Sequence, residues 1–246
     1  MKVKNAISRR QLIQSGALFA ALPTIKAAEN TTPARAKVII TGGHPGDPEY
    51  GCGGMIAHLA AIKNEVVLLY LNEGEPREQS PRQPKGTRAA EARSACEILG
   101  ARPLFASQID GDAIVDRAHY DEFRKLLETE RPDAVFTHWP IDNHADHRAI
   151  SMLVYDAWLR MKRTFALYYY EVSNGEDTVQ FTPTHYVDIQ SVERKKFAAC
   201  YAHKSQSPEK FYALQDRVAE WRGTESGHTR AEAFIKHAQS KKFALP

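Results

Sequence analysis

Cysteine is scarce in this chain, which excludes a disulfide framework and a zinc site built from cysteine pairs. Among 246 residues, only Cys52, Cys96 and Cys200 occur, widely spaced and without a CxxC pair. A disulfide framework would need an even and denser set. We expect each cysteine to be a small buried residue, although one pair could form in an oxidising compartment.

The N-terminus lacks an apolar run long enough to cross a bilayer. The stretch at 17–22 is too short, but it follows a basic segment and precedes the small residues Ala27-Ala28. These are the three parts of an export signal, and the sequence around Arg9-Arg10 resembles a twin-arginine signal. We predict that 1–28 direct export to the periplasm through the twin-arginine machinery and that 29–36 form a linker. The alternative is a disordered basic tail with a chance pair of arginines.

Surplus positive charge is also absent once the N-terminal segment is set aside. The formal net charge is +3, but residues 1–28 contribute five of the basic residues and no acidic one, which leaves −2 for the remainder. This balance gives no indication of a nucleic-acid-binding face, and we predict no nucleic acid partner. A nucleotide-binding α/β protein is a third, less favoured hypothesis. No GxGxxG motif follows the first predicted strand, and His44-Pro45 at that place would obstruct phosphate binding.

What the sequence does contain is a regular alternation of strand and helix patterns. The predicted strands are 37–40, 65–71, 103–107, 134–137, 165–172 and 184–189. The predicted helices are 53–63, 87–99, 118–130 and 146–161, and the rest is expected to be largely helical. This alternation favours one α/β domain over residues 37–246. We expect a Rossmann-like, mostly parallel sheet with helices on both faces.

Two polar segments follow predicted strands and share a chemistry. The segment 44–54 follows the first strand, and the segment 138–147 follows the fourth. In a sheet of order 3-2-1-4-5 these strands are neighbours, so both segments would meet at the carboxyl ends of the strands, where such sheets bind ligands.

The spacing within these segments suits a metal site. His44 and Asp47 are three residues apart across a Pro-Gly turn, and His144 and His147 are three apart at a predicted helix start. Imidazole nitrogens and a carboxylate oxygen are zinc ligands, and a catalytic site keeps one position for water. By spacing alone, ordinary polar loop chemistry is an equally good interpretation.

The two segments resemble those of the PIG-L/LmbE-like deacetylases, zinc enzymes that remove acetyl groups from N-acetylated sugars and related amines. Further matches bring the resemblance to roughly residues 37–236. They are Arg88-Ala89-Ala90-Glu91, Asp110-Gly111, Lys195 to His203-Lys204-Ser205-Gln206, and Ala231-Glu232-Ala233-Phe234.

The resemblance implies a role for each matched residue. The zinc ligands would be His44, Asp47 and His147. His144 would stabilise the charged tetrahedral intermediate as a cationic donor, and Asp146 would orient a neighbouring histidine.

Two further matched residues, Arg88 and Asp110, would hold substrate hydroxyls. The alternatives are an Arg88–Glu91 pair on the helix surface and ordinary turn chemistry at Asp110.

One position departs from the family pattern. The first carboxylate after His-Pro serves that family as general base, and here the position is Gly46. Glu49 and Asp142 are the nearest carboxylates that could replace it. Otherwise the enzyme acts on a more activated substrate, or the site binds metal without catalysis.

Taken together, the residues and the resemblance predict an exported zinc-dependent amide hydrolase. We expect an N-deacetylase of a small N-acetylated amine, with a sugar favoured, and Fe²⁺ as an alternative metal. The second hypothesis is a weakly catalytic or non-catalytic metal- and carbohydrate-binding relative. The sequence leaves the substrate and the oligomeric state open.

Overall fold

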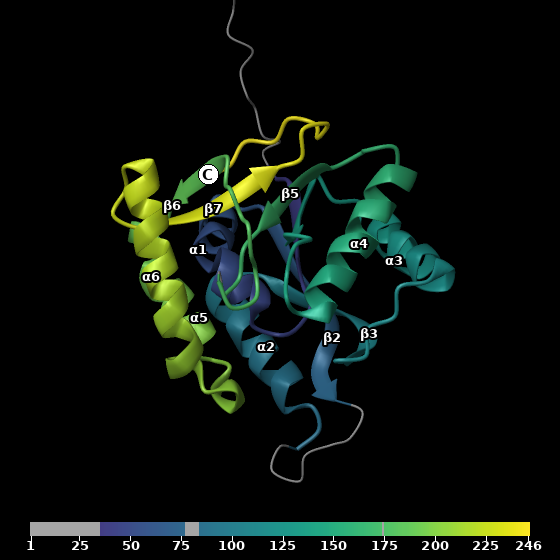
Figure 1. The fold of residues 1–246 in the computed structure, drawn as a ribbon, viewed down its shortest axis with the longest axis horizontal. Coiled ribbons are helices and arrows are strands. Elements are labelled where there is room, and N and C mark those ends of the chain that lie inside the picture. The colour runs from purple at the N-terminus through teal and green to yellow at the C-terminus, as the bar shows by residue number, and fades with distance from the viewer. Residues whose placement is uncertain (1–34, 77–83, 174) are drawn as a thin grey trace, which may run out of the picture.

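The computed structural model describes residues 35–76, 84–173 and 175–246, and these form a seven-stranded sheet (Figure 1). The strand order is β3-β2-β1-β4-β5-β7-β6. Five strands pair in parallel, whereas β7 runs antiparallel to both β5 and β6. The strands are β1 (Lys37–Gly42), β2 (Glu65–Pro76), β3 (Arg102–Asp110), β4 (Ala134–His138), β5 (Ala166–Tyr170), β6 (His185–Asp188) and β7 (Ala231–Lys236). The central strands therefore have the 3-2-1-4-5 order that the expected meeting of the two polar segments requires.

Helices cover both faces of the sheet, as the α/β prediction requires. In Figure 1, α3 and α4 lie together on one side, and α1, α2, α5 and α6 lie on the other. The helices are α1 (Asp47–Ala61), α2 (Thr87–Leu99), α3 (Arg117–Glu130), α4 (Ala145–Arg160), α5 (Glu193–Cys200) and α6 (Pro208–Ser226), with short 3₁₀ turns η1 (Gln190–Val192) and η2 (Lys204–Gln206). None of the helices in the described parts of the chain is long and apolar enough to cross a membrane.

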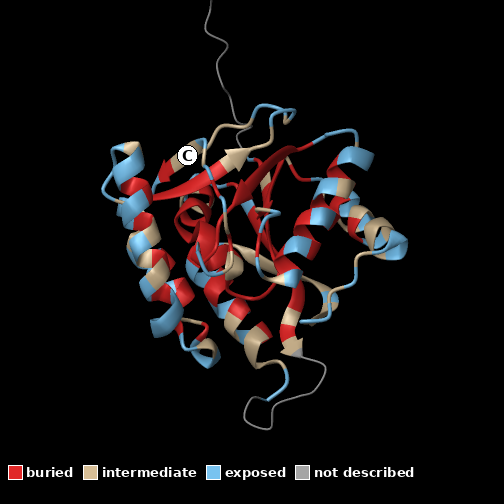
Figure 2. Cartoon of the chain, in the orientation of Figure 1, coloured by how far each residue is buried: buried red, intermediate tan, exposed pale blue. Residues whose placement is uncertain are grey.

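Each central strand is buried on both faces, which divides the apolar core into two clusters (Figure 2). In β1, Val38 and Ile40 belong to the cluster under α1 and α2, whereas Ile39 belongs to the cluster with α3 and α4. Alternate residues of a strand point to opposite faces, so a continuous apolar run is the pattern expected of a parallel strand covered by helices. The cysteines are all buried and unpaired.

Helix α1 begins earlier than the sequence indicated, at Asp47 rather than residue 53. Pro48 is compatible with a first helical turn, and carboxylates near a helix N-terminus are stabilised by its dipole. The glycines of this segment made the helix hard to recognise from the sequence, and in the structure they allow close packing. A Cβ at Gly54 would lie 2.3 Å from Ile189 Cγ2, which no ordinary side chain could tolerate.

One prediction about the C-terminal part of the domain was wrong. The segment Ala231–Lys236, expected to be helical, is strand β7 between β5 and β6. This segment has no run of β-branched residues that would indicate a strand in the sequence. It is a strand because its backbone pairs with β5 and β6. Ala36, placed in the linker, is fully buried, and its N–H donates to Asn64 Oδ1. The predicted export signal lies outside the described residues.

Candidate metal centre

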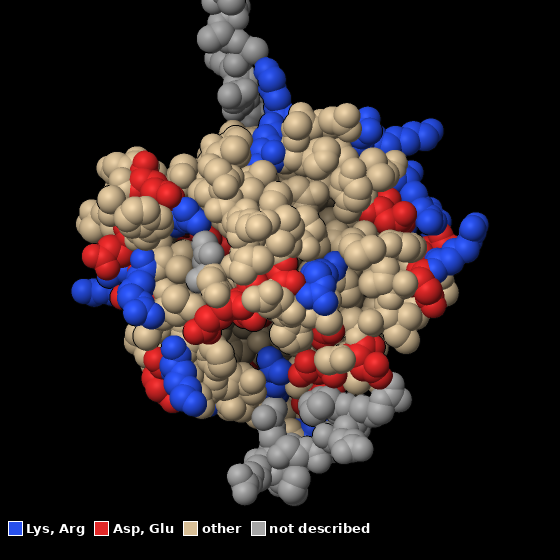
Figure 3. Space-filling view, in the orientation of Figure 1, with Lys and Arg blue, Asp and Glu red and all other residues tan. Residues whose placement is uncertain are grey.

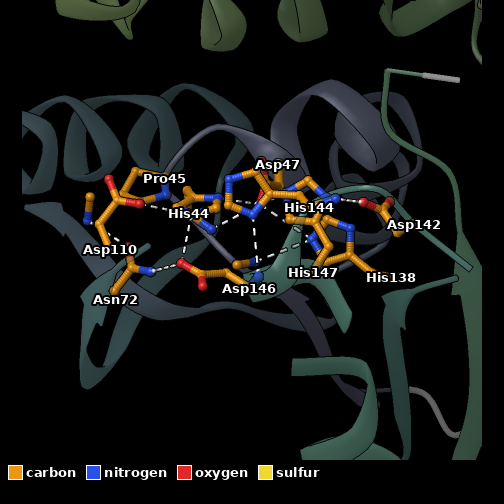
Figure 4. Close-up of polar contacts among 12 residues, drawn as sticks. His44, Pro45, Asp47, Asn72, Asp110, His138, Asp142, His144, Asp146 and His147 are labelled. Carbon is orange, nitrogen blue, oxygen red and sulfur yellow. Dashed lines mark hydrogen bonds and ion pairs between the residues drawn. The ribbon is translucent and has the colours of Figure 1, made fainter. Parts of the chain in front are cut away.

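The adjacent strands β1 and β4 bring the two polar segments together. Ile40 pairs with Phe136 in parallel register, so the chain leaves both strands at the same edge of the sheet. Asp47 is the first residue of α1, and His144 is the N-cap of α4. Figure 4 shows the histidines and aspartates of both segments pointing toward one another.

The carboxylate of Asp47 is the centre of this cluster. Its Oδ2 lies 3.4 Å from His44 Nδ1 and 3.2 Å from His147 Nε2. Ligands about 2.1 Å from a zinc ion in tetrahedral geometry lie about 3.4 Å from one another. Donor atoms within 4.8 Å of one another form two overlapping groups that share His147, namely His44 with His144 and His147, and Asp47 with His138 and His147. The three predicted ligands are divided between these groups, and their imidazole nitrogens and carboxylate oxygen suit zinc in kind.

Other donors converge on the same place. His138 Nε2 is 3.2 Å from Asp47 Oδ2, and a ring nitrogen of His144 lies within 4.8 Å of His44 and His147. The His138 ring stacks on that of His147 at 4.0 Å and accepts a hydrogen bond from the Gly43 N–H. Burial lowers the pKa of His138 to about 4, so this ring is neutral. His138 thus lies beside two of the predicted metal ligands, Asp47 and His147.

The charge states of the predicted ligands suit a cation. Burial raises the pKa of Asp47, but the nearby His147 charge and contacts with three histidines hold it well below its usual range. For His147, burial lowers the pKa, and the Asp47 charge and contacts with Asp142 raise it to about 9. Burial lowers the pKa of His44, but hydrogen bonds to Asp110 and Asp146 raise it well above the ordinary value. Without metal, protons therefore supply the positive charge in this cluster.

Carboxylates contact both of the histidines that are predicted to bind metal. Asp146 Oδ2 lies 3.0 Å from His44 Nε2 and accepts hydrogen bonds from Gly111 N and Asn72 Nδ2. This contact matches the orienting role implied for Asp146. Such partners fix the tautomer and direction of a metal-binding imidazole.

His144 lies at the rim of the cluster in a different state from the one expected. Burial, followed by the charges of His44 and His147, lowers the pKa of His144, which favours the neutral ring. Its Nδ1 accepts a hydrogen bond from the Asp146 N–H, so the remaining proton is on Nε2. His144 is therefore placed to act as a neutral N–H donor rather than a resting cation.

The cluster opens into a cavity of about 250 Å³ that contains His44, Asp47, His144 and His147 in its wall. Figure 3 shows a hollow in the lower half of this face with acidic side chains around it. The other lining residues are Pro45, Gly46, Tyr50, Arg88, Asp110, Val172, Ser173, Asp177, His203, Gln206 and Phe211.

Arg88 and Asp110, the two predicted substrate contacts, both line this cavity. Arg88 Nη1 is 3.1 Å from Asp110 Oδ2, and Asp110 Oδ1 is 3.1 Å from His44 Nε2. The alternative Arg88–Glu91 pair does not form, because Glu91 accepts hydrogen bonds from the Ser205 N–H and hydroxyl. The arginine thus belongs to the site, with its guanidinium held in place by protein atoms.

The two carboxylates considered as replacement bases lie away from the cavity wall. Glu49 is fully buried, and its Oε1 accepts a hydrogen bond from Tyr70 OH at 2.7 Å and contacts His203 Nε2 at 3.0 Å. Asp142 lies behind His147, 3.0 Å from its Nδ1. Gly46 itself lines the cavity with φ +113°, a conformation that disfavours any side chain.

Several cavity residues were not found from the sequence, notably Asp177, Tyr50 and Phe211. Asp177 follows the fifth strand, so the rule that ligands bind beyond strand ends could have indicated it. Tyr50 and Phe211 gave no such signal, since they lie on helices whose facing side depends on tertiary packing.

The fold and this cluster define an α/β protein with a candidate metal centre at the carboxyl ends of its parallel strands. Residues 39–158 match the family model described as PIG-L: GlcNAc-PI de-N-acetylase. The chain therefore contains a PIG-L domain, which confirms the resemblance seen in its motifs.

Solved structures with this fold extend the match beyond residue 158. One is GalB, the 4-carboxy-2-hydroxymuconate hydratase of Pseudomonas putida (TM-score 0.74, 22% identity, 86% of this chain and 100% of that chain). Another is the N,N'-diacetylchitobiose deacetylase of Pyrococcus horikoshii (TM-score 0.71, 22% identity, 82% and 84%). A third is a conserved protein of Thermus thermophilus (TM-score 0.72, 23% identity, 85% and 97%). At these identities, the likeness establishes the shared fold.

Proposed function

We propose that this protein is a zinc-dependent amide hydrolase, specifically an N-deacetylase of an N-acetylated sugar or related small amine. The observation that supports this most is the convergence of His44, Asp47 and His147 at the mouth of a cavity within a PIG-L domain. Two histidines and one carboxylate leave a coordination position open, as hydrolytic zinc sites do.

The cavity supports a small or terminal substrate group. Its volume of about 250 Å³ is near the lower end of ligand pockets, which span roughly 300–1,000 Å³. Arg88 and Asp110 present polar groups on one wall, suited to sugar hydroxyls. A neighbour of the same fold is described as a deacetylase of N,N'-diacetylchitobiose, which agrees with an N-acetylated carbohydrate.

The chain's own residues supply positioning and a hydrogen-bond donor. A zinc ion held by His44, Asp47 and His147 would act as a Lewis acid that polarises the amide carbonyl. Asp146 orients the His44 ring, and Asp142 orients the ring of His147. His144 Nε2–H donates a hydrogen bond to the oxygen on which negative charge develops, which stabilises the transition state.

Acetate release from a panel of N-acetylated sugars by the zinc-loaded protein tests this proposal. We expect release by the wild type and none by His147→Ala, which also fails to retain one zinc per chain. His144→Gln should retain zinc but lose about 10²–10³-fold in kcat. The matched control is His228→Ala, because His228 is exposed and outside the cavity. Zinc content and activity that are the same in His147→Ala and wild type would contradict the proposal.

Gly46 favours a second candidate, a weakly catalytic or non-catalytic metal- and carbohydrate-binding relative. The fold is also compatible with chemistry other than amide hydrolysis, since one neighbour is described as a hydratase. The variant Gly46→Asp distinguishes the two candidates. A large gain in acetate release would show that the wild-type protein is weakly catalytic because it lacks a base at position 46. Gly46→Ala is its control, because any side chain at φ +113° introduces backbone strain of about 1–3 kcal/mol.

A further inference from the structure

The centre lacks a carboxylate where the resemblance implies the general base. Position 46 is the N-cap of α1, and a Cβ there would face the Tyr50 ring at 3.4 Å. A glycine in this place offers no proton acceptor. Hydrolysis of an unactivated amide benefits about 10²–10⁴-fold from a positioned base, so another residue of the wall is expected to serve.

Most nearby carboxylates already have partners that fix them elsewhere. Glu49 contacts His203 and Tyr70, and it does not line the cavity. Asp142 is held between His147 and Thr178, with hydrogen bonds to both of its oxygens. These contacts leave neither carboxylate free to reach a water in the cavity.

The two carboxylates nearest His44 also have partners that hold them in place. Asp110 bridges His44 and Arg88, and both of these partners carry positive charge in the metal-free protein. Asp146 Oδ2 binds the His44 ring and two further N–H donors. Their contacts suit orientation of the site rather than proton abstraction.

Among the described residues that line the cavity, the carboxylates are Asp47, Asp110 and Asp177. Asp47 is a predicted metal ligand and Asp110 has the partners given above, so Asp177 is left. It is half-buried, and the side chain contacts Ser173 rather than a cation. Burial raises the pKa of Asp177, the His147 charge lowers it, and the charges of Asp142 and Asp47 raise it further. A carboxylate in this environment is a stronger proton acceptor than an exposed aspartate.

Hydrogen bonds fix the segment around Asp177 to the metal-binding side of the domain. The carbonyl of Asp177 accepts from the Asn143 N–H at 2.8 Å, next to His144 in the chain. The following residue, Thr178, donates its hydroxyl to Asp142 Oδ2 at 2.9 Å, and Asp142 Oδ1 lies 3.0 Å from His147 Nδ1. These hydrogen bonds hold the backbone that carries Asp177 beside the segment of His144 and His147, and the Asp177 side chain lines the same cavity as both histidines.

Given the proposed function, we propose that Asp177 is the general base that replaces the missing carboxylate at position 46. Its carboxylate takes one proton from the attacking water while the water oxygen bonds to the amide carbonyl carbon. The same proton then passes to the departing nitrogen as the C–N bond breaks. Water and the N-acetylated amine thereby give acetic acid and the free amine, with no other reactant.

Steady-state kinetics of Asp177→Asn test the assignment, because this variant keeps the shape and removes the acceptor. We expect kcat to fall about 10²–10⁴-fold with KM changed less than about threefold. Zinc content should match wild type, and Asp177→Glu should recover part of kcat. The control is Glu176→Gln, an exposed neighbour whose side chain lies outside the cavity wall.

Two results would overturn the assignment and leave the deacetylase proposal intact. One is a kcat for Asp177→Asn within about threefold of wild type. The other is a change confined to KM, which would make Asp177 a substrate-binding residue. A wild-type protein that retains zinc but releases no acetate from any N-acetylated sugar would refute both proposals at once.

Discussion

Nδ1 of His147 lies 3.0 Å from Oδ1 of Asp142, which leaves Nε2 of the same ring facing Asp47 at 3.2 Å. Asp142 is fixed in turn by the Thr178 hydroxyl and the His144 N–H. One carboxylate thus determines both the direction of a predicted metal ligand and the start of α4.

Asp142→Asn should weaken zinc binding about 10–100-fold, because the amide no longer stabilises the proton on His147 Nδ1. Competition with a chelator of known affinity measures this change. Asp121→Asn, on the surface of α3, is the control and should bind zinc as wild type does. Equal affinities for Asp142→Asn and wild type would show that the contact has no role in metal binding.

Zinc binding at pH 7 should release protons. In the metal-free protein the pKa of His147 is raised to about 9, so the ring is protonated below that pH and must lose its proton to bind metal. Affinity should therefore rise with pH up to about 9. Calorimetry in buffers of different ionisation enthalpy counts the protons, and we expect at least one per zinc. Binding without proton release would contradict the His147 assignment.

The buried pair of Lys196 and Glu232 should be a large contributor to stability. Lys196 Nζ lies 2.7 Å from Glu232 Oε1, and the same carboxylate accepts the N–H groups of Gly54 and Met55. Lys196→Met leaves a buried charge unpaired and should cost about 3–5 kcal/mol in urea unfolding. In the double variant Lys196→Met/Glu232→Gln, the loss should be smaller than the sum of the single losses.

The surface pair of Lys37 and Glu65 is the comparison for that experiment. Its atoms are 3.1 Å apart, but the Glu65 side chain is about half exposed, at 48%. Lys37→Met should therefore cost under about 1 kcal/mol. A similar cost at both sites would show that burial does not govern these ion pairs.

Replacement of Arg9-Arg10 by Lys-Lys should stop export, because the twin-arginine receptor reads the arginine pair. The measurement is the distribution of the protein between periplasmic and cytoplasmic fractions in a host that has this machinery. Lys2→Gln, which leaves the pair intact, should be exported normally. Periplasmic recovery of the Lys-Lys variant would rule out this route.

The sequence by itself determined the layers of the fold and the two segments in which the candidate site lies. Continuous apolar runs such as 37–40 and 65–71 can be buried only in a sheet covered on both faces, so the pattern specifies the layers. His44, Asp47 and His147 were selected as ligands through the resemblance of their motifs to a known family, and their places just beyond a strand or at a helix start gave them a common location. Gly46 was identified in the same way, as the matched position where that family has a carboxylate.

Only the tertiary structure decided which polar groups have partners and which face the cavity. Glu49 and Asp142 were reasonable bases by sequence distance, yet contacts with His203 and Thr178, from remote parts of the chain, hold them outside the cavity wall. The neutral state of His144 likewise depends on burial and on the charges of His44 and His147. Strand β7 and the cavity carboxylate Asp177 were missed for the same reason. Pairing and desolvation depend on neighbours that are distant in sequence, and no local pattern records them.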